Sequence, residues 1–276
     1  MLNVLSLFSG IGAFEKALEN LKIPYHLVGY CEIDKYASKA YSAIHGVSED
    51  KNLRDVTKID ILDIEDRVDL ITYGFPCQDI SNAGKQKGFT DENGERTRSG
   101  LFFEALRIID EYKPKFAIAE NVKALTSKKF TNEFKTVLDS LDEVGYNNYY
   151  QVLNAKDYGI PQNRERVFII SIRKDIDKGF SFPQPIPLDI RLKDLLEDEV
   201  NESFYLTNKS LVDLVKKLEP KETSGVDKSV NNPRLIDNAN CITAREDRGI
   251  SNHKAEGTAV IEIGETDDID TFLNED

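Results

Sequence analysis

Short apolar runs alternate with amphipathic segments through the first 173 residues of the chain. The apolar runs predict β-strands, and the segments with hydrophobic residues three or four positions apart predict helices between them. This alternation is typical of an α/β domain built on a doubly wound, mostly parallel sheet. Strands are expected at 2–8, 26–31, 69–75, 116–119, 149–154 and 166–173, with helices at 13–21, 35–45, 101–112 and 131–144.

The pattern weakens after residue 173, and three prolines within 183–187 predict a linker. A boundary near residue 180 would separate a first domain, 1–180, from a smaller C-terminal region, 181–276. The segment 261–270 is rich in Asp and Glu, which predicts a solvated acidic tail. We therefore expect one large α/β domain, followed by a linker and a small second region.

Charge is distributed unevenly between these two parts. The net charge of the chain is -13, but residues 1–180 hold 25 Lys and Arg against 28 Asp and Glu. Residues 181–276 hold 11 and 21, so most of the acidic excess lies there. A nearly neutral first domain does not exclude an anionic partner such as a nucleic acid.

The segment 76–100 interrupts the alternation, with four glycines and little apolar content. Loops of this length in a compact domain are usually functional or disordered. Its basic residues are Lys85, Lys87, Arg96 and Arg98. A basic lid with glycine hinges suits a large anionic substrate.

Composition excludes several classes of protein. No apolar stretch approaches the roughly 20 residues that span a membrane, and the N-terminus lacks the basic and small-residue features of a signal peptide. Three cysteines and three histidines, with no cysteine pair near a histidine, favour neither a disulfide framework nor a metal site. We therefore expect a cytoplasmic protein without a metal, in a reducing setting that keeps thiols free.

A glycine turn, Phe8–Gly12, follows the first expected strand. Glycines at this place let a ligand approach the backbone, and the start of the following helix favours negative charge. The full G-x-G-x-x-G pattern is absent because Glu15 occupies the third glycine position. Glu32 follows at the end of the next strand, where an acid can bind a ribose diol. Turn and acid together indicate a nucleoside cofactor, with a structural turn and a surface carboxylate as the alternatives.

Cys77 directly follows Pro76 and an apolar strand, at the kind of strand end where α/β sheets bind ligands. A thiol there is a candidate nucleophile, although a free cysteine is more often a small buried hydrophobe. Glu120 follows the strand 116–119, where capping the next helix is the alternative role. Alternation would place Arg164 and Arg166 on one face of the last strand, with surface arginines as the alternative.

Taken together and in order, these motifs resemble the DNA cytosine-5 methyltransferases of bacterial and phage restriction-modification systems. The matching words are Phe8-Ser-Gly-Ile-Gly12, Glu32, Leu53-Arg-Asp-Val56, Gly74-Phe-Pro-Cys-Gln78, Glu120-Asn-Val122 and Gln162-Asn-Arg-Glu-Arg166. The resemblance implies a Rossmann-like methyltransferase sheet over 1–180 and a small, incomplete target-recognition region within 181–276.

The resemblance also implies S-adenosylmethionine as the cofactor and S-adenosylhomocysteine as its product. Phe8–Gly12 would line the methionine and ribose parts, Glu32 would bind the ribose hydroxyls and Asp55 would face the adenine amino group. The implied cofactor-binding residues are Phe8, Ser9, Gly10, Ile11, Gly12, Glu32, Ile33, Asp55, Val56, Pro76 and Leu101.

The implied substrate is double-stranded DNA with the target cytosine flipped out of the helix. The Cys77 thiolate would attack carbon-6 of the base and make carbon-5 nucleophilic toward the methyl group. Glu120 would hydrogen-bond nitrogen-3 and the exocyclic amine, and must be protonated to donate to nitrogen-3. Arg166, with Arg164, would bind the base oxygen and nearby charge.

Two C-terminal words of the family, Pro-Arg-Glu and Gly-Asn, do not occur in the sequence. Either a second polypeptide supplies this part, or the chain is a truncated or diverged form. The first alternative function is therefore a catalytically incompetent subunit that binds cofactor or DNA only. The others are a tRNA methyltransferase of the same fold and a nicotinamide oxidoreductase, in which Cys77, Glu120 and Arg166 would have no joint role.

Overall fold

The computed structural model describes residues 1–60, 64, 66–76, 98–197 and 239–240. The chain divides into two compact units, Met1–Leu153 with Glu165–Gln184, and Asn154–Arg164 with Pro185–Asp276. The expected boundary near residue 180 stays a prediction. Cys77, most of the basic segment 76–100 and the acidic segment 261–270 lie outside the described residues.

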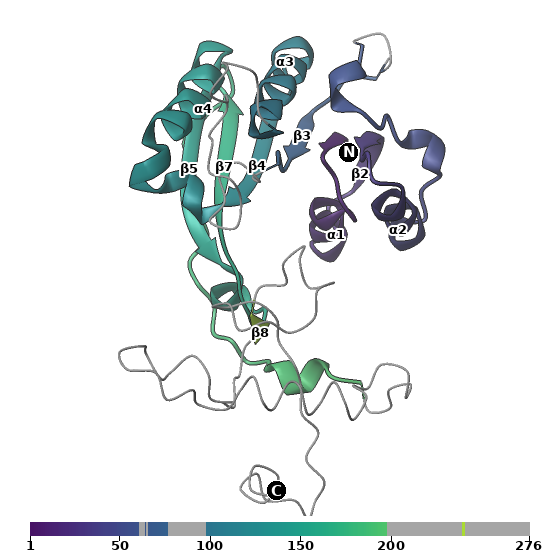
Figure 1. Ribbon diagram of the computed structural model, residues 1–276, viewed down its shortest axis with the longest axis vertical. Coiled ribbons are helices and arrows are strands. Elements are labelled where there is room, and N and C mark those ends of the chain that lie inside the picture. The colour runs from purple at the N-terminus through teal and green to yellow at the C-terminus, as the bar shows by residue number, and fades with distance from the viewer. Residues whose placement is uncertain (61–63, 65, 77–97, 198–238, 241–276) are drawn as a thin grey trace, which may run out of the picture. The chain divides into compact units, whose positions relative to one another are not determined.

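A six-stranded sheet forms the centre of the first unit (Figure 1). Its strands are β1 (Leu2–Leu7), β2 (Tyr25–Cys31), β3 (Leu70–Tyr73), β4 (Phe116–Val122), β5 (Tyr146–Asn154) and β7 (Glu165–Arg173). Their order is β2-β1-β3-β4-β7-β5. β1 pairs in parallel with β2 and β3, β3 pairs in parallel with β4, and β4 pairs antiparallel with β7. The expected mostly parallel α/β sheet is therefore confirmed.

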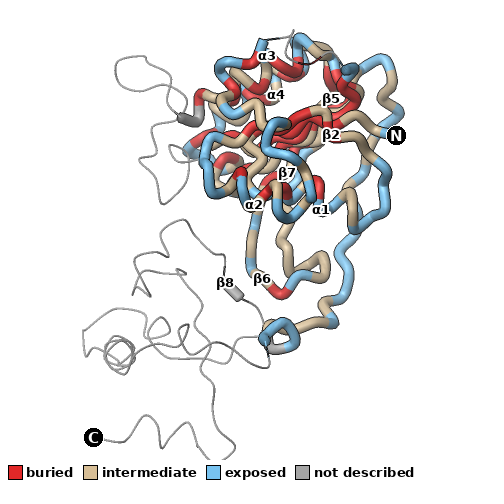
Figure 2. Tube along the Cα trace, turned by 90° about the vertical axis from the view of Figure 1, so that its right-hand side faces the viewer, coloured by how far each residue is buried: buried red, intermediate tan, exposed pale blue. Residues whose placement is uncertain are grey.

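Helices cover both faces of this sheet. The α-helices among the described residues are α1 (Ala13–Asn20), α2 (Lys35–His45), α3 (Phe102–Tyr112) and α4 (Thr131–Glu143). Figure 2 shows α3 and α4 on one side of the sheet, and α1 and α2 on the other. Short 3-10 helices connect these elements: η1 (Glu49–Lys51), η2 (Val56–Lys58), η4 (Arg98–Leu101), η5 (Lys123–Thr126) and η6 (Lys128–Phe130).

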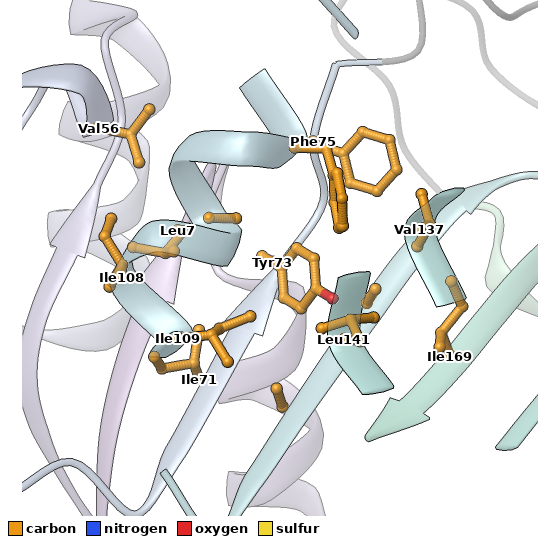
Figure 3. Packing of buried hydrophobic residues seen from close by; sticks show 14 of the residues in the cluster. Leu7, Val56, Ile71, Tyr73, Phe75, Ile108, Ile109, Val137, Leu141 and Ile169 are labelled. Atoms are coloured by element: carbon orange, nitrogen blue, oxygen red, sulfur yellow. The ribbon is translucent and has the colours of Figure 1, made fainter. Parts of the chain in front are cut away.

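The main hydrophobic core lies between the sheet and the helices α3 and α4 (Figure 3). Ile71 and Tyr73 of β3 pack there with Ile108 of α3 and Leu141 of α4. All four residues of β3 are buried, as expected for a central parallel strand that is covered on both faces. Burial of one such side chain stabilises the fold by roughly 1.5–3 kcal/mol, so this layer holds the strand ends in place.

Local sequence signals explain where the helix α2 begins and ends. The Asp34 carboxylate accepts hydrogen bonds from the backbone N–H groups of Tyr36 and Ala37, which caps the helix. Gly46 then ends it in the left-handed conformation, with φ 62°. A second, smaller core joins this helix to the sheet through Tyr41, which stacks on Tyr30 of β2 at 4.0 Å between ring centroids.

The second unit has less regular structure among its described residues. They include the strands β6 (Gln162–Asn163) and β8 (Ala239–Asn240), which pair in parallel, and the 3-10 helices η7 (Ala155–Tyr158) and η8 (Leu192–Leu195). Most of the expected target-recognition region lies outside the described residues. None of the described helices in either unit has both the length and the apolar content needed to cross a bilayer.

Candidate active site

The parallel pairing of the four strands ends in one aligned row at the carboxyl edge of the sheet. The row consists of Cys31, Leu7, Tyr73 and Ala119, and the residues that follow them are Glu32, Phe8, Gly74 and Glu120. Because these four residues continue neighbouring strands, they lie side by side along one edge. Open α/β sheets bind their ligands at this edge. The structure thus brings the predicted cofactor residues Phe8 and Glu32 to the same edge as Glu120.

The glycine turn after β1 has left-handed backbone at three positions. The φ angles are 54° at Phe8, 56° at Gly10 and 84° at Gly12. Left-handed backbone costs a non-glycine residue such as Phe8 about 1–3 kcal/mol and concentrates at ligand-binding sites. A Cβ added to Gly10 would meet no heavy atom of the described residues within 4 Å. The backbone at Gly10 is therefore open to an approaching ligand.

Glu32 is fixed beside this turn by hydrogen bonds to backbone N–H groups. Its Oε2 accepts from Gly10 at 2.9 Å, and its Oε1 accepts from Asp34 at 2.8 Å. The Asn52 side chain holds the backbone of Glu32 as well, because it accepts from the N–H at 3.1 Å and donates to the carbonyl at 2.9 Å. Sequence reasoning missed Asn52, which belongs to no motif and acts from another segment of the chain.

Asp55 lies at the start of η2 and presents an ionised carboxylate. It accepts hydrogen bonds from the Thr57 backbone N–H at 3.1 Å and from the Thr57 hydroxyl at 2.8 Å. The hydroxyl bond is the main cause that holds the pKa of Asp55 below its ordinary value. A carboxylate in this state can accept a hydrogen bond from an amino group.

Glu120 and Arg166 form an ion pair across the antiparallel strands β4 and β7. The Arg166 Nε lies 3.0 Å from the Glu120 Oε1, with the side chains 18% and 27% exposed. Glu120 faces Phe168 in the ladder, so Arg166 is its diagonal neighbour on the same face of the sheet. A Cβ added to Gly74 would lie 3.9 Å from the Glu120 Oε2, which places the pair beside the chain that leaves β3.

Asn121 connects this pair to the turn that leads to Cys77. Its side chain is buried, and its Nδ2 donates to the Phe75 carbonyl at 3.1 Å while its Oδ1 accepts from the Val122 N–H at 2.8 Å. Phe75 is followed by Pro76, which is half-buried, and then by Cys77, which the structure does not describe. Asn121 was not predicted to have a role of its own, although a polar amide at a buried position of an alternating strand indicates a structural hydrogen bond.

The other predicted cofactor residues divide by burial. Ile11 and Ile33 are 55% and 78% exposed, so both side chains are accessible to a ligand. Val56 is buried in the main core, and the half-buried Leu101 packs against that core. The Val56 side chain therefore supports the fold, and contact with a ligand there would come from its backbone.

Arg164 belongs to the second unit, between β6 and β7. Its backbone N–H donates to the Asn154 side chain at 3.0 Å, and its carbonyl accepts from the Ala155 N–H at 3.0 Å. β7 begins only at Glu165, so the strand alternation that was expected to align Arg164 with Arg166 does not reach it. Its role in binding the base stays a prediction.

Cys31 is a buried free cysteine at the end of β2. Burial raises the pKa of its thiol, which makes it a structural residue rather than a nucleophile. In the described part of the chain, no group of three or more His, Cys, Asp or Glu side chains could hold a metal ion.

The chain thus has a Rossmann-like α/β sheet with a glycine turn, a spaced acid and an acid–arginine pair along its carboxyl edge. The family model for C-5 cytosine-specific DNA methylases matches residues 2–265 of the chain. The chain belongs to this family, which confirms the resemblance found in the sequence.

Known relatives include phage and bacterial enzymes. The orphan methyltransferase M.SPRI of Bacillus phage SPR is 41% identical over 246 residues, which are 79% of this chain and 55% of that protein. The type II methyltransferase M2.ScrFI of Lactococcus lactis subsp. cremoris is 37% identical over 263 residues, 77% of this chain and 72% of that protein. The solved structure of the Entamoeba histolytica methyltransferase EhMeth matches with a TM-score of 0.61 and 26% identity, over 78% of this chain and 64% of that one. The chain thus spans little more than half the length of the phage SPR relative.

Proposed function

We propose that the chain is the catalytic part of an S-adenosylmethionine-dependent DNA cytosine-5 methyltransferase. The observation that carries this proposal is the order of groups along the carboxyl edge. Glu32 and the glycine turn follow β2 and β1, Glu120 and Arg166 lie on β4 and β7, and β3 stands between the two sets. The chain that leaves β3 runs through Pro76 to Cys77, so the nucleophile would lie between a cofactor half and a base half.

The cofactor half fits a nucleoside. Each carboxylate oxygen has two acceptor sites, so Glu32 can accept from ribose hydroxyls while it bonds to Gly10 and Asp34. The ionised Asp55 would accept from the adenine amino group, and the open backbone at Gly10 would face the methionine part. When bound, S-adenosylmethionine supplies an electrophilic methyl group.

The base half fits a flipped cytosine. Attack of the Cys77 sulfur on carbon-6 would form a C–S bond and move an electron pair toward nitrogen-3, which leaves carbon-5 nucleophilic. The protonated Glu120 carboxyl would donate its proton to nitrogen-3 and accept a hydrogen bond from the exocyclic amine, and Arg166 would hold that carboxyl in place and stabilise the developing charge. After methyl transfer, the carbon-5 proton would pass to solvent as the C–S bond breaks, and the nitrogen-3 proton would return to Glu120, which releases the base and the Cys77 thiolate.

The proposed substrate is double-stranded DNA, and residues 1–180 would form the catalytic domain. Residues 181–276 would form a linker and part of a target-recognition region, with a second polypeptide as the source of any missing motifs. The family model for C-5 cytosine-specific DNA methylases supports a role in DNA modification, and a cytoplasmic location is part of the proposal.

The test is methyl transfer by the purified chain. It is incubated with methyl-labelled S-adenosylmethionine and either unmethylated duplex DNA of mixed sequence or tRNA. We expect label on carbon-5 of cytosine in DNA, and no transfer by Cys77→Ser, which should still bind the cofactor. Binding of cofactor and DNA without transfer would favour an incompetent subunit, and label on tRNA alone would favour an RNA methyltransferase.

A further inference from the structure

His45, the last residue of α2, lies directly against the glycine turn. Its side chain is 1% exposed. Its Nε2 lies 3.1 Å from the carbonyl oxygen of Ile11, and its Nδ1 lies 2.8 Å from the Oε1 of Glu19 on α1. A Cβ added to Gly12 would lie 2.2 Å from the His45 Nε2, so only glycine at position 12 leaves room for the ring. The imidazole therefore connects both helices to the backbone of the turn.

The two partners of this ring are both acceptors. A neutral imidazole has one donor and one acceptor nitrogen, whereas the imidazolium has two donors. A backbone carbonyl and a carboxylate can only accept, so both bonds form together only when His45 carries two protons. Its place at the C-terminal end of α2 also favours a positive charge.

Charged and titratable groups face this ring from each neighbouring element. On α1, Glu19 also binds Lys16 at 3.0 Å, and the buried Glu15 lies one turn earlier. From β2, the Tyr25 hydroxyl donates to the same Glu19 oxygen at 3.4 Å. On α2 itself, the Tyr41 ring lies 4.7 Å from the imidazole, and burial followed by the charge of Glu15 raises its pKa.

Glu19 is the acidic group in direct contact with the ring. Its hydrogen bond to His45 is the main cause that lowers the pKa of Glu19 to about 2. Glu19 is thus a carboxylate at neutral pH, and its negative charge lies beside the ring.

We propose that His45, kept as a cation by Glu19, is a positioning residue that holds the Ile11–Gly12 backbone in its cofactor-binding conformation. This inference rests on the proposed function, which assigns the turn to S-adenosylmethionine. When the imidazolium loses a proton, one ring nitrogen turns a lone pair toward an oxygen and one of the two bonds is lost. The turn then loses its fixed geometry, and cofactor affinity falls as the pH rises.

The experiment measures the Kd of S-adenosylhomocysteine by calorimetry, from about pH 5.5 to about 8.5, where imidazole titrates. It compares the wild-type chain with His45→Gln and Glu19→Gln. The matched control is His26→Gln, because His26 also pairs with a carboxylate, Asp66 at 3.5 Å, but is 42% exposed. Protonation of S-adenosylhomocysteine itself changes the Kd of all four proteins equally. The Kd of each protein at each pH is therefore divided by the Kd of His45→Gln at the same pH.

The wild type and His26→Gln should bind about 3- to 10-fold more weakly at the alkaline end, the equivalent of one lost hydrogen bond. Glu19→Gln should bind more weakly than the wild type at neutral pH, because the ring loses the carboxylate that accepts from its Nδ1. The ratios would be flat if His45 had no such role, and a Glu19→Gln profile identical to that of the wild type would also overturn the inference.

The variants need not all fold for the test to decide. If thermal unfolding shows that His45→Gln is unfolded, the binding profiles of the wild type and Glu19→Gln are compared directly. A wild-type chain that binds no S-adenosylhomocysteine at any pH would overturn the proposed function and this inference with it. Binding that is tight but independent of His45 and pH would overturn the inference alone.

Discussion

Asn121→Ala removes the side chain that connects the strand of Glu120 to the turn before Cys77. The substitution removes the side-chain hydrogen bonds of the buried Phe75 carbonyl and of the half-buried Val122 N–H. A buried backbone group left unpaired costs about 1–3 kcal/mol and the half-buried one costs less, so the free energy of unfolding should fall by about 2–4 kcal/mol. That is a large part of the stability of an ordinary domain. The turn should also shift, and misplacement of a catalytic group by about 1 Å lowers rates about 100-fold.

Asn148→Ala is the matched control for this change. Asn148 donates to the Leu138 and Tyr146 carbonyls at 3.2 and 3.3 Å and accepts from the Ser171 hydroxyl at 2.7 Å. Ser171 pairs with Ala117, toward the other end of β4 from Glu120.

Denaturant unfolding should show that both variants are destabilised, while methyl transfer, measured where both are folded, should fall only in Asn121→Ala. The reasoning is refuted if Asn121→Ala unfolds within about 0.5 kcal/mol of the wild type. Equal losses of rate in the two variants would refute it as well.

Three further predictions concern the turn, the acid-side stability and the ion pair. Gly10→Ala and Gly145→Ala both place a side chain on positive-φ backbone with open space around it, so each should lower the free energy of unfolding by about 1–2 kcal/mol. Only Gly10→Ala should weaken binding of S-adenosylhomocysteine in calorimetry, and equal binding by the two variants would contradict a cofactor site at the turn. Because the pKa of Glu19 is lowered, the ionised side chain stabilises the fold fully above the ordinary pKa of 4.5, and this stabilisation is lost as the pH falls toward 2. In Glu19→Gln, the free energy of unfolding should therefore fall less steeply between these pH values than in the wild type. An unchanged slope would count against the hydrogen bond between Glu19 and His45. Arg166→Lys keeps the positive charge but loses the planar guanidinium, so the rate of methyl transfer should fall about 100-fold while the Kd of the cofactor stays unchanged. Full activity of this variant would exclude a role for Arg166 in binding the base.

Sequence patterns predict the sheet because its central strands are buried on both faces. The run 70–73 is continuous in apolar and β-branched residues, and all of it is buried. The shared edge of Phe8, Glu32 and Glu120 follows as well, since parallel strands present their carboxyl ends together. The order of the strands and the antiparallel direction of β7 do not follow, because periodicity carries no information on pairing.

Other features depend on tertiary contacts that no local pattern encodes. The strand expected at 116–119 continues to Val122, because pairing with β7 extends past the polar Glu120. His45 was not predicted as a residue of the turn, since its contact with Ile11 depends on how α2 packs against α1. Asn52 reaches Glu32 from the segment after η1 in the same way.

The most direct test of the central claim is a covalent adduct between Cys77 and DNA. Duplex DNA of mixed sequence that carries 5-fluorocytosine is incubated with the chain and S-adenosylmethionine. Fluorine cannot leave carbon-5 as a proton does, so the adduct should persist after methyl transfer. Denaturing gels should show a protein–DNA complex, and mass spectrometry of its peptides should place the modified base on the Cys77 sulfur. A cofactor-bound chain that forms no adduct, or one that forms it equally in Cys77→Ser, would contradict the account.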